Sequence, residues 1–303
     1  MSELAQSGAP VRSARLRLSA ELWRRPWLKV VALLALPVLA FAVVYLGSLV
    51  ALFISSFWQV DAFTGKIVHT WTFANFSSLI HDPVYRRIAF RTIWIAAAVT
   101  VADAILAFPL AYFMARLAPP RLRALLFVLV LLPLWTSYLV RIYAWRTILA
   151  KDGALNWALN GLGLPDANLA YTNTAMWIVF SYVWLPFMVL PVYAALERIP
   201  DSYLEASQDL GGRSWRTFRS VILPLALPGI VAGSIFTFSL TLGDFITPAL
   251  VGGANSQFIG NVVHSYVGIS NNVPLAAAFA VVPVIVMAVY LLVAKRLGAF
   301  EAL

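Results

Sequence analysis

Long apolar stretches separated by polar segments recur along the whole chain. Six of them approach or exceed the roughly 18 residues that an α-helix needs to cross a membrane. They run over residues 28–53, 92–114, 124–149, 174–196, 221–242 and 274–294. Each is apolar on every face, whereas the strands of a membrane β-barrel are segments of about 10 residues with alternating polarity. The pattern therefore predicts an all-α integral membrane protein with six transmembrane helices.

The composition agrees with a membrane protein. Of the 303 residues, 61% are hydrophobic and only 12% are charged, against about 25% charged in soluble domains. The first stretch is longer than the roughly 7–15-residue core of a signal peptide, so we interpret it as an uncleaved helix. The chain has no Cys, and His69, His81 and His264 lie apart in polar connections, so the sequence indicates no metal site.

Basic residues set the expected orientation, because Lys and Arg near helix ends are retained on the cytoplasmic side. With the N-terminus inside, the inner segments hold 15 of the 22 Lys and Arg residues, which are Arg12, Arg15, Arg17, Arg24, Arg25, Lys29, Arg116, Arg121, Arg123, Arg198, Arg213, Arg216, Arg219, Lys295 and Arg296. We therefore expect a bacterial inner membrane protein with both termini in the cytoplasm. This topology also explains the net charge of +9 without a nucleic-acid partner.

The polar segments divide the expected fold. Residues 1–27 form a cytoplasmic arm, residues 28–296 the six-helix domain, and residues 297–303 a cytoplasmic tail. Residues 55–91 and 150–173 are the long connections expected on the outer side, and the second of them is rich in turn dipeptides.

The loop of residues 197–220, between the fourth and fifth helices, has the pattern of a structured element. Asp201 or Ser202 is expected to cap a short helix, which Gly211-Gly212 would end with a positive φ. A second amphipathic piece should then bring Trp215 and Phe218 together. The loop therefore predicts a helix-turn-helix knob facing the cytoplasm, although a basic-aromatic helix resting on the membrane surface would show similar features.

This loop resembles the signature of ABC-importer permeases, in which Glu-Ala-Ala, three residues, Gly and nine residues precede an aliphatic residue, one further position and Leu-Pro. The matching positions are Glu205, Ala206, Ser207, Gly211, Val221, Leu223 and Pro224, with Ser207 in place of the second Ala and Val221 in place of the usual Ile. The resemblance implies the type I ABC-importer permease fold and a coupling helix that docks on an ATPase subunit. Glu205 would lie at the docking surface, Ala206 and Ser207 would permit close approach, and Gly211 would set the bend.

Other segments look like the spermidine/putrescine permease subfamily, namely residues 132–145, 185–191, 250–253 and 259–261. The resemblance implies a permease subunit that moves a small solute, best a polyamine, into the cytoplasm. Relatives with the same segments import ferric iron, thiamine, phosphonates or opines, so these solutes stay open as alternatives.

The implied partners are a second homologous permease, two ATPase subunits, a periplasmic solute-binding protein and membrane lipid, with no nucleic acid. Energy must come from the ATPase subunits, which would bind ATP-Mg, because this chain lacks a Gly-x-x-x-x-Gly-Lys-Ser/Thr phosphate cradle. We therefore expect a non-catalytic subunit with no cofactor of its own.

Ionisable residues at membrane depth are candidates for the solute path, because burying a charge in hydrocarbon is costly. Asp103 could serve the path or pair structurally with Arg141. Asp244 begins a stretch to Pro274 without Lys or Arg, where a carboxylate and aromatic rings would suit an ammonium group. The candidate path residues are Asp244, Asp103, Trp135 and Tyr138, although an ordinary interfacial belt would also explain the aromatic residues and helix-end hydrogen bonding would explain Asp244.

Two other classes of membrane protein fit the sequence less well. An ion-coupled secondary transporter would be built from inverted repeats, and none is visible. A membrane-embedded enzyme would need clustered catalytic residues such as His-Glu-x-x-His, and the apolar stretches hold none. Copurification with an ATPase would discriminate between an importer subunit and a secondary transporter.

Overall fold

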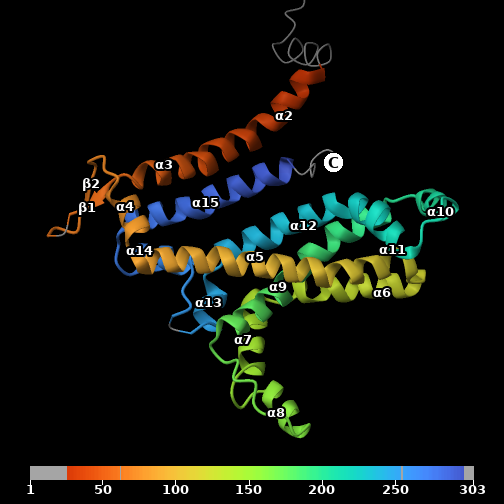
Figure 1. Ribbon diagram of the computed structural model, residues 1–303. Coiled ribbons are helices and arrows are strands. Elements are labelled where there is room, and N and C mark those ends of the chain that lie inside the picture. Colours follow the sequence, from red (N-terminus) through yellow and green to blue (C-terminus); the bar gives the residue numbers. More distant parts are fainter. Residues whose placement is uncertain (1–25, 62, 254, 297–303) are drawn as a thin grey trace, which may run out of the picture. The chain divides into compact units, whose positions relative to one another are not determined.

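The computed structural model describes residues 26–61, 63–253 and 255–296, most of them helical (Figure 1). The tail expected at residues 297–303 lies outside the described residues, as does nearly all of the arm expected at residues 1–27. The chain falls into two compact units, one ending at Ile54 and one beginning at Ser55.

The described residues of the first unit belong to one long helix. α2 (Pro26–Ala40) continues through a π-helical segment, η1 (Phe41–Leu46), into α3 (Gly47–Ser55). The backbone stays helical at both junctions, with φ near −60° at Ala40 and Gly47. Residues Leu33–Ser55 have a mean hydropathy of 2.5 and are long enough to cross a membrane. The first predicted span is therefore confirmed.

The second unit contains the other five predicted spans. They are α5 (Pro83–Tyr112) with η2 (Phe113–Leu117), α6 (Pro120–Leu131) with η3 (Leu132–Trp135) and α7 (Tyr138–Ile148), α9 (Asn173–Glu197), α11 (Ser214–Thr217) with η4 (Phe218–Ile222) and α12 (Leu223–Gly243), and α15 (Val273–Arg296). By length and hydropathy the described residues give five unbroken candidate spans, or six if the bent pair of α6 and α7 is one span. The all-α architecture predicted from the sequence is confirmed.

The third predicted span is sharply bent. The helical segments Pro120–Trp135 and Tyr138–Ile148 meet at 96°. Between them Thr136 and Ser137 have extended backbone, with ψ of 151° and 135°. Pro133 has no N–H to continue the helical ladder, and its carbonyl accepts a hydrogen bond from the Thr136 hydroxyl at 2.7 Å. The prediction of one continuous helix over residues 124–149 was therefore wrong.

α5 begins nine residues earlier than the predicted start at Thr92. The Asp82 carboxylate accepts a hydrogen bond from the Val84 N–H at 2.8 Å, and Pro83 occupies the first turn, where its missing N–H costs nothing. The end of the predicted outer connection, residues 55–91, is therefore helical, and it includes Arg86, Arg87 and Arg91.

Short elements fill the polar connections. β1 (Gln59–Val60) and β2 (Ile67–Val68) form a small antiparallel hairpin. The short helices are α4 (Ala74–His81), α8 (Ala154–Gly161), α10 (Asp201–Asp209), α13 (Ile246–Leu250) and α14 (Ile259–Gly268). Figure 1 shows α10 and α11 together at one end of the α9 and α12 helices, whereas α13 and α14 lie toward the other end.

α5, α9 and α12 form the centre of the second unit and run side by side (Figure 1). Small residues let α9 and α12 approach closely. A Cβ at Gly229 would lie 2.6 Å from the Pro191 carbonyl oxygen, and one at Gly233 would lie 2.6 Å from Met188 Sδ. Lipid tails are as apolar as the side chains, so the hydrophobic effect does little to bring helices together in a membrane. Close backbone contact of this kind stabilises their packing through van der Waals interactions.

Candidate functional site

The coupling loop, residues 197–220, folds as the predicted knob. α10 spans Asp201–Asp209 and is followed by Gly211 at φ +76°. The helix is N-capped by Pro200 and has no side-chain capping bond, so the prediction that Asp201 or Ser202 caps it was wrong. Asp201 instead lies in the first turn, where a negative charge is favourable.

The turn between the two helical pieces is tight. The Gly212 N–H donates to the Ser207 carbonyl oxygen at 2.8 Å, and the hydroxyls of Ser207 and Thr217 are 2.9 Å apart. A Cβ at Gly212 would lie 2.5 Å from the Ser207 carbonyl oxygen. Gly211 therefore supplies the backbone conformation and Gly212 allows the close approach, a role of Gly212 that the sequence pattern alone does not indicate.

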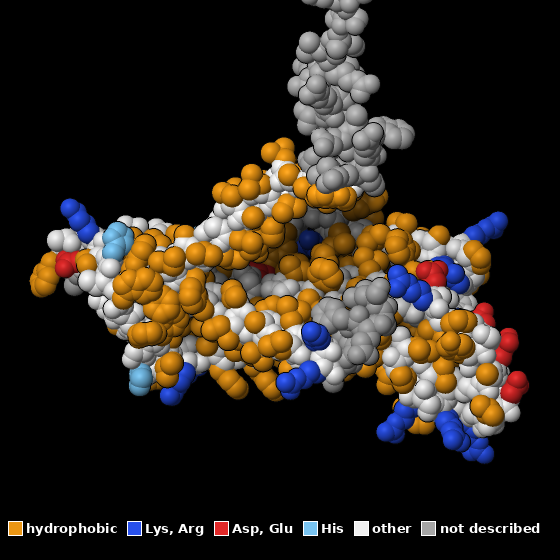
Figure 2. Space-filling view, turned by 90° about the horizontal axis from the view of Figure 1, so that it is seen from above, with side chains coloured by type: hydrophobic (Ala, Val, Ile, Leu, Met, Phe, Trp, Pro, Cys, Tyr) orange, Lys and Arg blue, Asp and Glu red, His pale blue; other side chains and the backbone are white. Residues whose placement is uncertain are grey.

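The exposed surface of the coupling loop is mixed in charge and partly apolar, with acidic side chains on α10 and Arg213, Arg216 and Arg219 after it. Asp201, Glu205 and Asp209 recur every four residues of α10, and acidic side chains gather at the end of the molecule that carries it (Figure 2). Leu210 is 87% exposed and Trp215 69% exposed. Leu210 lies outside the candidate spans, whereas Trp215 lies in the first turn of the fifth span. A large apolar side chain exposed outside a span, such as Leu210, favours a protein-binding surface.

The second piece of the loop continues into the fifth span without a break. α11, η4 and α12 follow one another directly, with Leu223 and Pro224 at the start of α12. The rings of Trp215 and Phe218 stack with centroids 5.3 Å apart, which confirms their predicted proximity. A displacement of the knob would therefore reach α12 through continuous helix.

Asp244 lies at the opposite end of α12 and is held by its own chain. It is 8% exposed. Its Oδ1 accepts hydrogen bonds from the N–H groups of Ile246 at 2.7 Å and Thr247 at 3.2 Å. Its Oδ2 accepts from the hydroxyls of Thr247, at 3.0 Å, and Tyr138. These neutral donors fix the carboxylate but do not cancel its charge, and the structure shows no ion pair to it within the described residues.

Of the other predicted path residues, Tyr138 is brought to Asp244 and the rest are not. Tyr138 stacks on Trp184 with centroids 5.6 Å apart, and the Arg141 guanidinium lies 5.8 Å from the Tyr138 ring centroid. Trp135 is 83% exposed. Asp103 is fully buried and shows no ion pair with Arg141 in the part of the chain that the structure describes.

A hollow of about 490 Å³ lies beside Asp244. Among the described residues its lining contains neither Lys nor Arg, and its polar side chains are those of Tyr143, Gln257, Asn261, His264 and Ser265. The Asn261 amide is engaged at both ends, since its Nδ2 donates to the Phe245 carbonyl oxygen at 2.7 Å and its Oδ1 accepts from the Phe258 N–H at 3.0 Å, so the other polar side chains are the ones available to a solute. The hollow can therefore offer neutral hydrogen-bond acceptors to a small polar solute.

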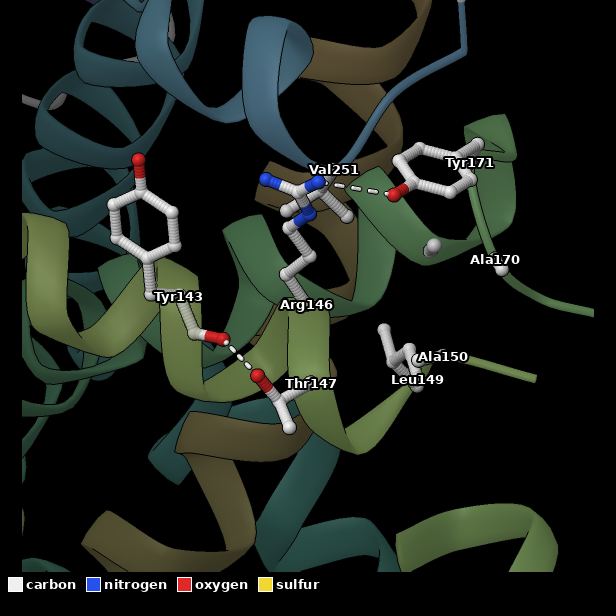
Figure 3. A pocket seen from close by; sticks show the side chains of 9 residues that line it. Tyr143, Arg146, Thr147, Leu149, Ala150, Ala170, Tyr171 and Val251 are labelled. Atoms are coloured by element: carbon white, nitrogen blue, oxygen red, sulfur yellow. Dashed lines mark hydrogen bonds between the residues drawn. The ribbon is translucent and has the colours of Figure 1, made fainter. Parts of the chain in front are cut away.

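A second hollow, of about 260 Å³, is lined by one cationic side chain, that of Arg146 (Figure 3). The Arg146 Nη2 donates to the Tyr171 hydroxyl at 3.1 Å, and the guanidinium carbon lies 5.7 Å from the Tyr171 ring centroid. Figure 3 shows both side chains at the rim of this hollow. A solute with ammonium groups would be repelled here, so the hollow beside Asp244 is the better candidate for such a solute.

Among residues 26–61, 63–253 and 255–296, no group of three or more His, Cys, Asp or Glu side chains could hold a metal ion. The residues gathered at the two candidate sites are instead suited to protein docking and to solute binding.

Residues 107–300 match the protein family described as binding-protein-dependent transport system inner membrane component. The matched region starts within α5 and contains the coupling loop.

Curated relatives match most of the chain. It is 48% identical to the inner membrane ABC transporter permease protein YdcU of Escherichia coli K12, over 97% of this chain and 98% of the relative. It is 36% identical to the spermidine/putrescine transport system permease protein PotB of Escherichia coli K12, over 84% of this chain and 91% of the relative. PotB of Haemophilus influenzae is 34% identical over 74% and 79% of the two chains.

Solved structures share the fold at low sequence identity. A chain of a bacterial alginate ABC transporter, in complex with an alginate pentasaccharide-bound periplasmic protein, matches with a TM-score of 0.73 and 17% identity, over 94% of this chain and 98% of that one. A chain of the inward-facing MetNI methionine ABC transporter matches with a TM-score of 0.55 and 18% identity, over 72% and 95%.

Proposed function

We propose that this chain, which belongs to the binding-protein-dependent transport system inner membrane component family, carries polyamines such as spermidine or putrescine into the cytoplasm. Family membership makes it a permease subunit of an ABC importer, a multi-pass inner membrane protein that itself catalyses no reaction. The resemblance, the type I permease fold and the non-catalytic role expected from the sequence are therefore confirmed. Membership also decides against a secondary transporter and a membrane enzyme.

The observation that carries the solute proposal is the 36% identity with a spermidine/putrescine permease over 84% of the chain. The chemistry of the hollow beside Asp244 supports it. No Lys or Arg occurs from Asp244 to Pro274, and the Asp244 charge is not neutralised by an ion pair among the described residues. Phe245 adds an aromatic ring to the lining. Ammonium groups favour both carboxylate charge and aromatic faces.

In this proposal Asp244 attracts the solute through its charge rather than by direct contact, since its oxygens are already occupied by four donors. Tyr138 holds the carboxylate in place. Asp103 would join the path only if α5 and α9 separated, because it lines none of the hollows described above.

The proposed partners are a second homologous permease, two ATPase subunits that bind ATP-Mg, and a periplasmic solute-binding protein. The solved alginate transporter in complex with a periplasmic protein supports the last of these. The exposed charged and apolar side chains of the coupling loop support docking of an ATPase subunit, with Glu205 and Ala206 on the exposed surface and Ser207 turned toward Thr217. Both chain termini are proposed to lie in the cytoplasm with the loop.

Competition for uptake tests the solute. Cells without polyamine uptake of their own would express this chain with its cognate partners and be given labelled putrescine or spermidine. We expect saturable uptake that unlabelled polyamines suppress and that ferric iron, thiamine, phosphonates and opines do not. Suppression by one of these other solutes, with no competition by polyamines, would overturn the proposal.

A matched pair of variants makes the same experiment sensitive to charge. Ser265→Lys places a cation in the hollow and should reduce polyamine uptake, whereas Ser265→Met adds an unbranched side chain of comparable length without charge and should reduce it much less. Equal effects of the two variants would contradict a cationic solute at this hollow.

A further inference from the structure

Arg116 joins three elements at the end of the molecule that carries the coupling loop. It lies in η2, at the end of the span that begins with α5. Its Nη1 donates to Asp201 Oδ1 in α10 at 2.7 Å. Its Nη2 donates to the carbonyl oxygen of Leu196, near the end of α9, at 2.7 Å, and to that of Ile199, which follows the helix. One guanidinium thus connects α5, α9 and the first turn of α10.

The setting of this guanidinium is much less solvated than an ordinary surface ion pair. The Arg116 side chain is 13% exposed, whereas that of Asp201 is 81% exposed. Leu196 and Ile199 belong to a buried apolar cluster that also contains Met114. Carbonyl groups at a helix C-terminus lack intrahelical donors, and the planar fork of Arg can satisfy two of them together with a carboxylate.

A second contact ties the other arm of the coupling loop to the same helix. The Phe108 ring of α5 meets the Phe218 ring of η4 edge-on, with centroids 5.5 Å apart. The knob therefore rests on the end of α5 at two places, by Arg116 under α10 and by Phe108 under η4. A force applied to the knob would move α5 as well as the helices directly joined to it.

We propose that Arg116 is a positioning residue for transport, which fixes α10 to α5 and α9 so that displacement of the coupling loop is transmitted to the α5 span. The inference rests on the proposed docking of the loop on an ATPase subunit. Without Arg116 the ATPase subunit would still dock, but α10 could then move about Pro200 without moving α5 and α9 by the same amount.

The neighbouring pair of Arg123 and Glu197 offers a matched control. Its N–O distance is 3.8 Å, and the two side chains are 36% and 50% exposed. It lies at the same end of the bundle, on α6 and α9, and removal of its charge by Arg123→Gln is chemically identical to Arg116→Gln. Loose, exposed pairs contribute little, so this control should leave transport within about twofold of wild type.

The test compares Arg116→Gln, Arg116→Lys, Asp201→Asn and Arg123→Gln in the assembled transporter. Three quantities are measured, namely the amount of copurified ATPase subunit, the ATP hydrolysed per solute imported, and the distance distribution between spin labels on Gln208→Cys and Arg121→Cys. This chain has no native Cys, so it is labelled only at the two introduced positions, and it is labelled before assembly with its partners.

For Arg116→Gln we expect a normal amount of copurified ATPase subunit and a broadened distribution of label distances. The ATP hydrolysed per solute imported should rise at least about tenfold, the factor that corresponds to loss of one charged hydrogen-bonding group. Arg116→Lys should recover part of the coupling, because Lys keeps the charge but not the fork. Asp201→Asn should act weakly, since the two carbonyl bonds remain.

Three results would overturn the inference. The first is an Arg116→Gln transporter that behaves like Arg123→Gln in coupling and label distance. The second is loss of the assembled complex in both Arg116 variants, which would indicate a role in folding alone. The third is a Gly211→Asp variant, with a disrupted loop, that copurifies with as much ATPase subunit as wild type. That result would show that the loop is not the docking site, and copurification would reveal it before the Arg116 variants are compared.

Discussion

Gly212 is predicted to be the least replaceable residue of the coupling loop. A Cβ there would lie 2.5 Å from the Ser207 carbonyl oxygen, 2.7 Å from Ser207 Oγ and 3.1 Å from Thr217 Oγ1. Rotating a side chain cannot relieve a clash with a backbone oxygen. Gly212→Ala must therefore push α10 away from α11 and weaken both the Gly212 N–H to Ser207 bond and the Ser207 to Thr217 bond.

The cost can be set against that of the adjacent glycine. Overpacking costs about 1–3 kcal/mol, and each of the two hydrogen bonds, which is stretched and not broken, costs about 0.5 kcal/mol, the lower end of its net worth, so we expect about 2–4 kcal/mol for Gly212→Ala. At Gly211 a Cβ meets no atom of this chain within 4 Å, so Gly211→Ala costs only the strain of its left-handed φ, about 1–2 kcal/mol. If the loop must regain its native conformation in order to dock, the full cost of each substitution lowers the affinity for the ATPase subunit. The affinity then falls about 30- to 700-fold for Gly212→Ala and about 5- to 30-fold for Gly211→Ala.

Titration of the ATPase subunit against purified permease in lipid discs measures these affinities. Gly268→Ala is the control, because a Cβ at the end of α14 meets nothing within 4 Å and Gly268 has no positive φ; its affinity should be that of wild type. The reasoning would be refuted if Gly212→Ala bound the ATPase as tightly as wild type, or if Gly211→Ala weakened binding more than Gly212→Ala.

Two further predictions concern the solute and the topology. Asp244→Asn should lower polyamine uptake per assembled complex several-fold at limiting solute concentration, with a smaller loss of assembled complex from weaker hydrogen bonding; unchanged uptake per complex would remove Asp244 from the solute site. Single cysteines at Ser77 and Ser270 should react with an impermeant thiol reagent from outside, and one at Gln208 only after the membrane is opened. Gln208 is exposed, whereas Ser207 is engaged with Thr217, and labelling of Gln208→Cys from outside would contradict the expected orientation.

The spans and the coupling loop could be predicted from the sequence because their signals are local. A long apolar run defines a transmembrane helix whatever surrounds it, and the bounds differ by only a few residues except at α5 and in the third span. The positive φ of Gly211 was likewise expected from its place after a short helix. The bend in the third span was missed because residues 124–149 are apolar enough overall to predict one helix, although Pro133, Thr136 and Ser137 interrupt the run.

The contacts that decide the roles of individual residues could not be predicted, because they join distant parts of the chain. Tyr138 reaches Asp244 across 106 positions, and Arg116 reaches Asp201 across 85. In the sequence, Gly212 has no function that Gly211 does not already supply. Its role follows only from the closeness of the Ser207 carbonyl oxygen to the Gly212 backbone. Asp103 and Arg141 form no ion pair with each other among the described residues. Whether two such side chains meet depends on how their helices are rotated about their axes, which the sequence does not reveal.

ATP-dependent accumulation of spermidine in sealed vesicles tests the central claim most directly. The vesicles would hold this chain with its partner permease and ATPase subunits, with the binding protein supplied on the opposite side of the membrane from ATP. We predict accumulation that requires both ATP and the binding protein, and that does not respond to a proton or sodium gradient. Accumulation driven by an ion gradient without ATP, or ATP hydrolysis that the loaded binding protein stimulates without movement of spermidine, would contradict the account.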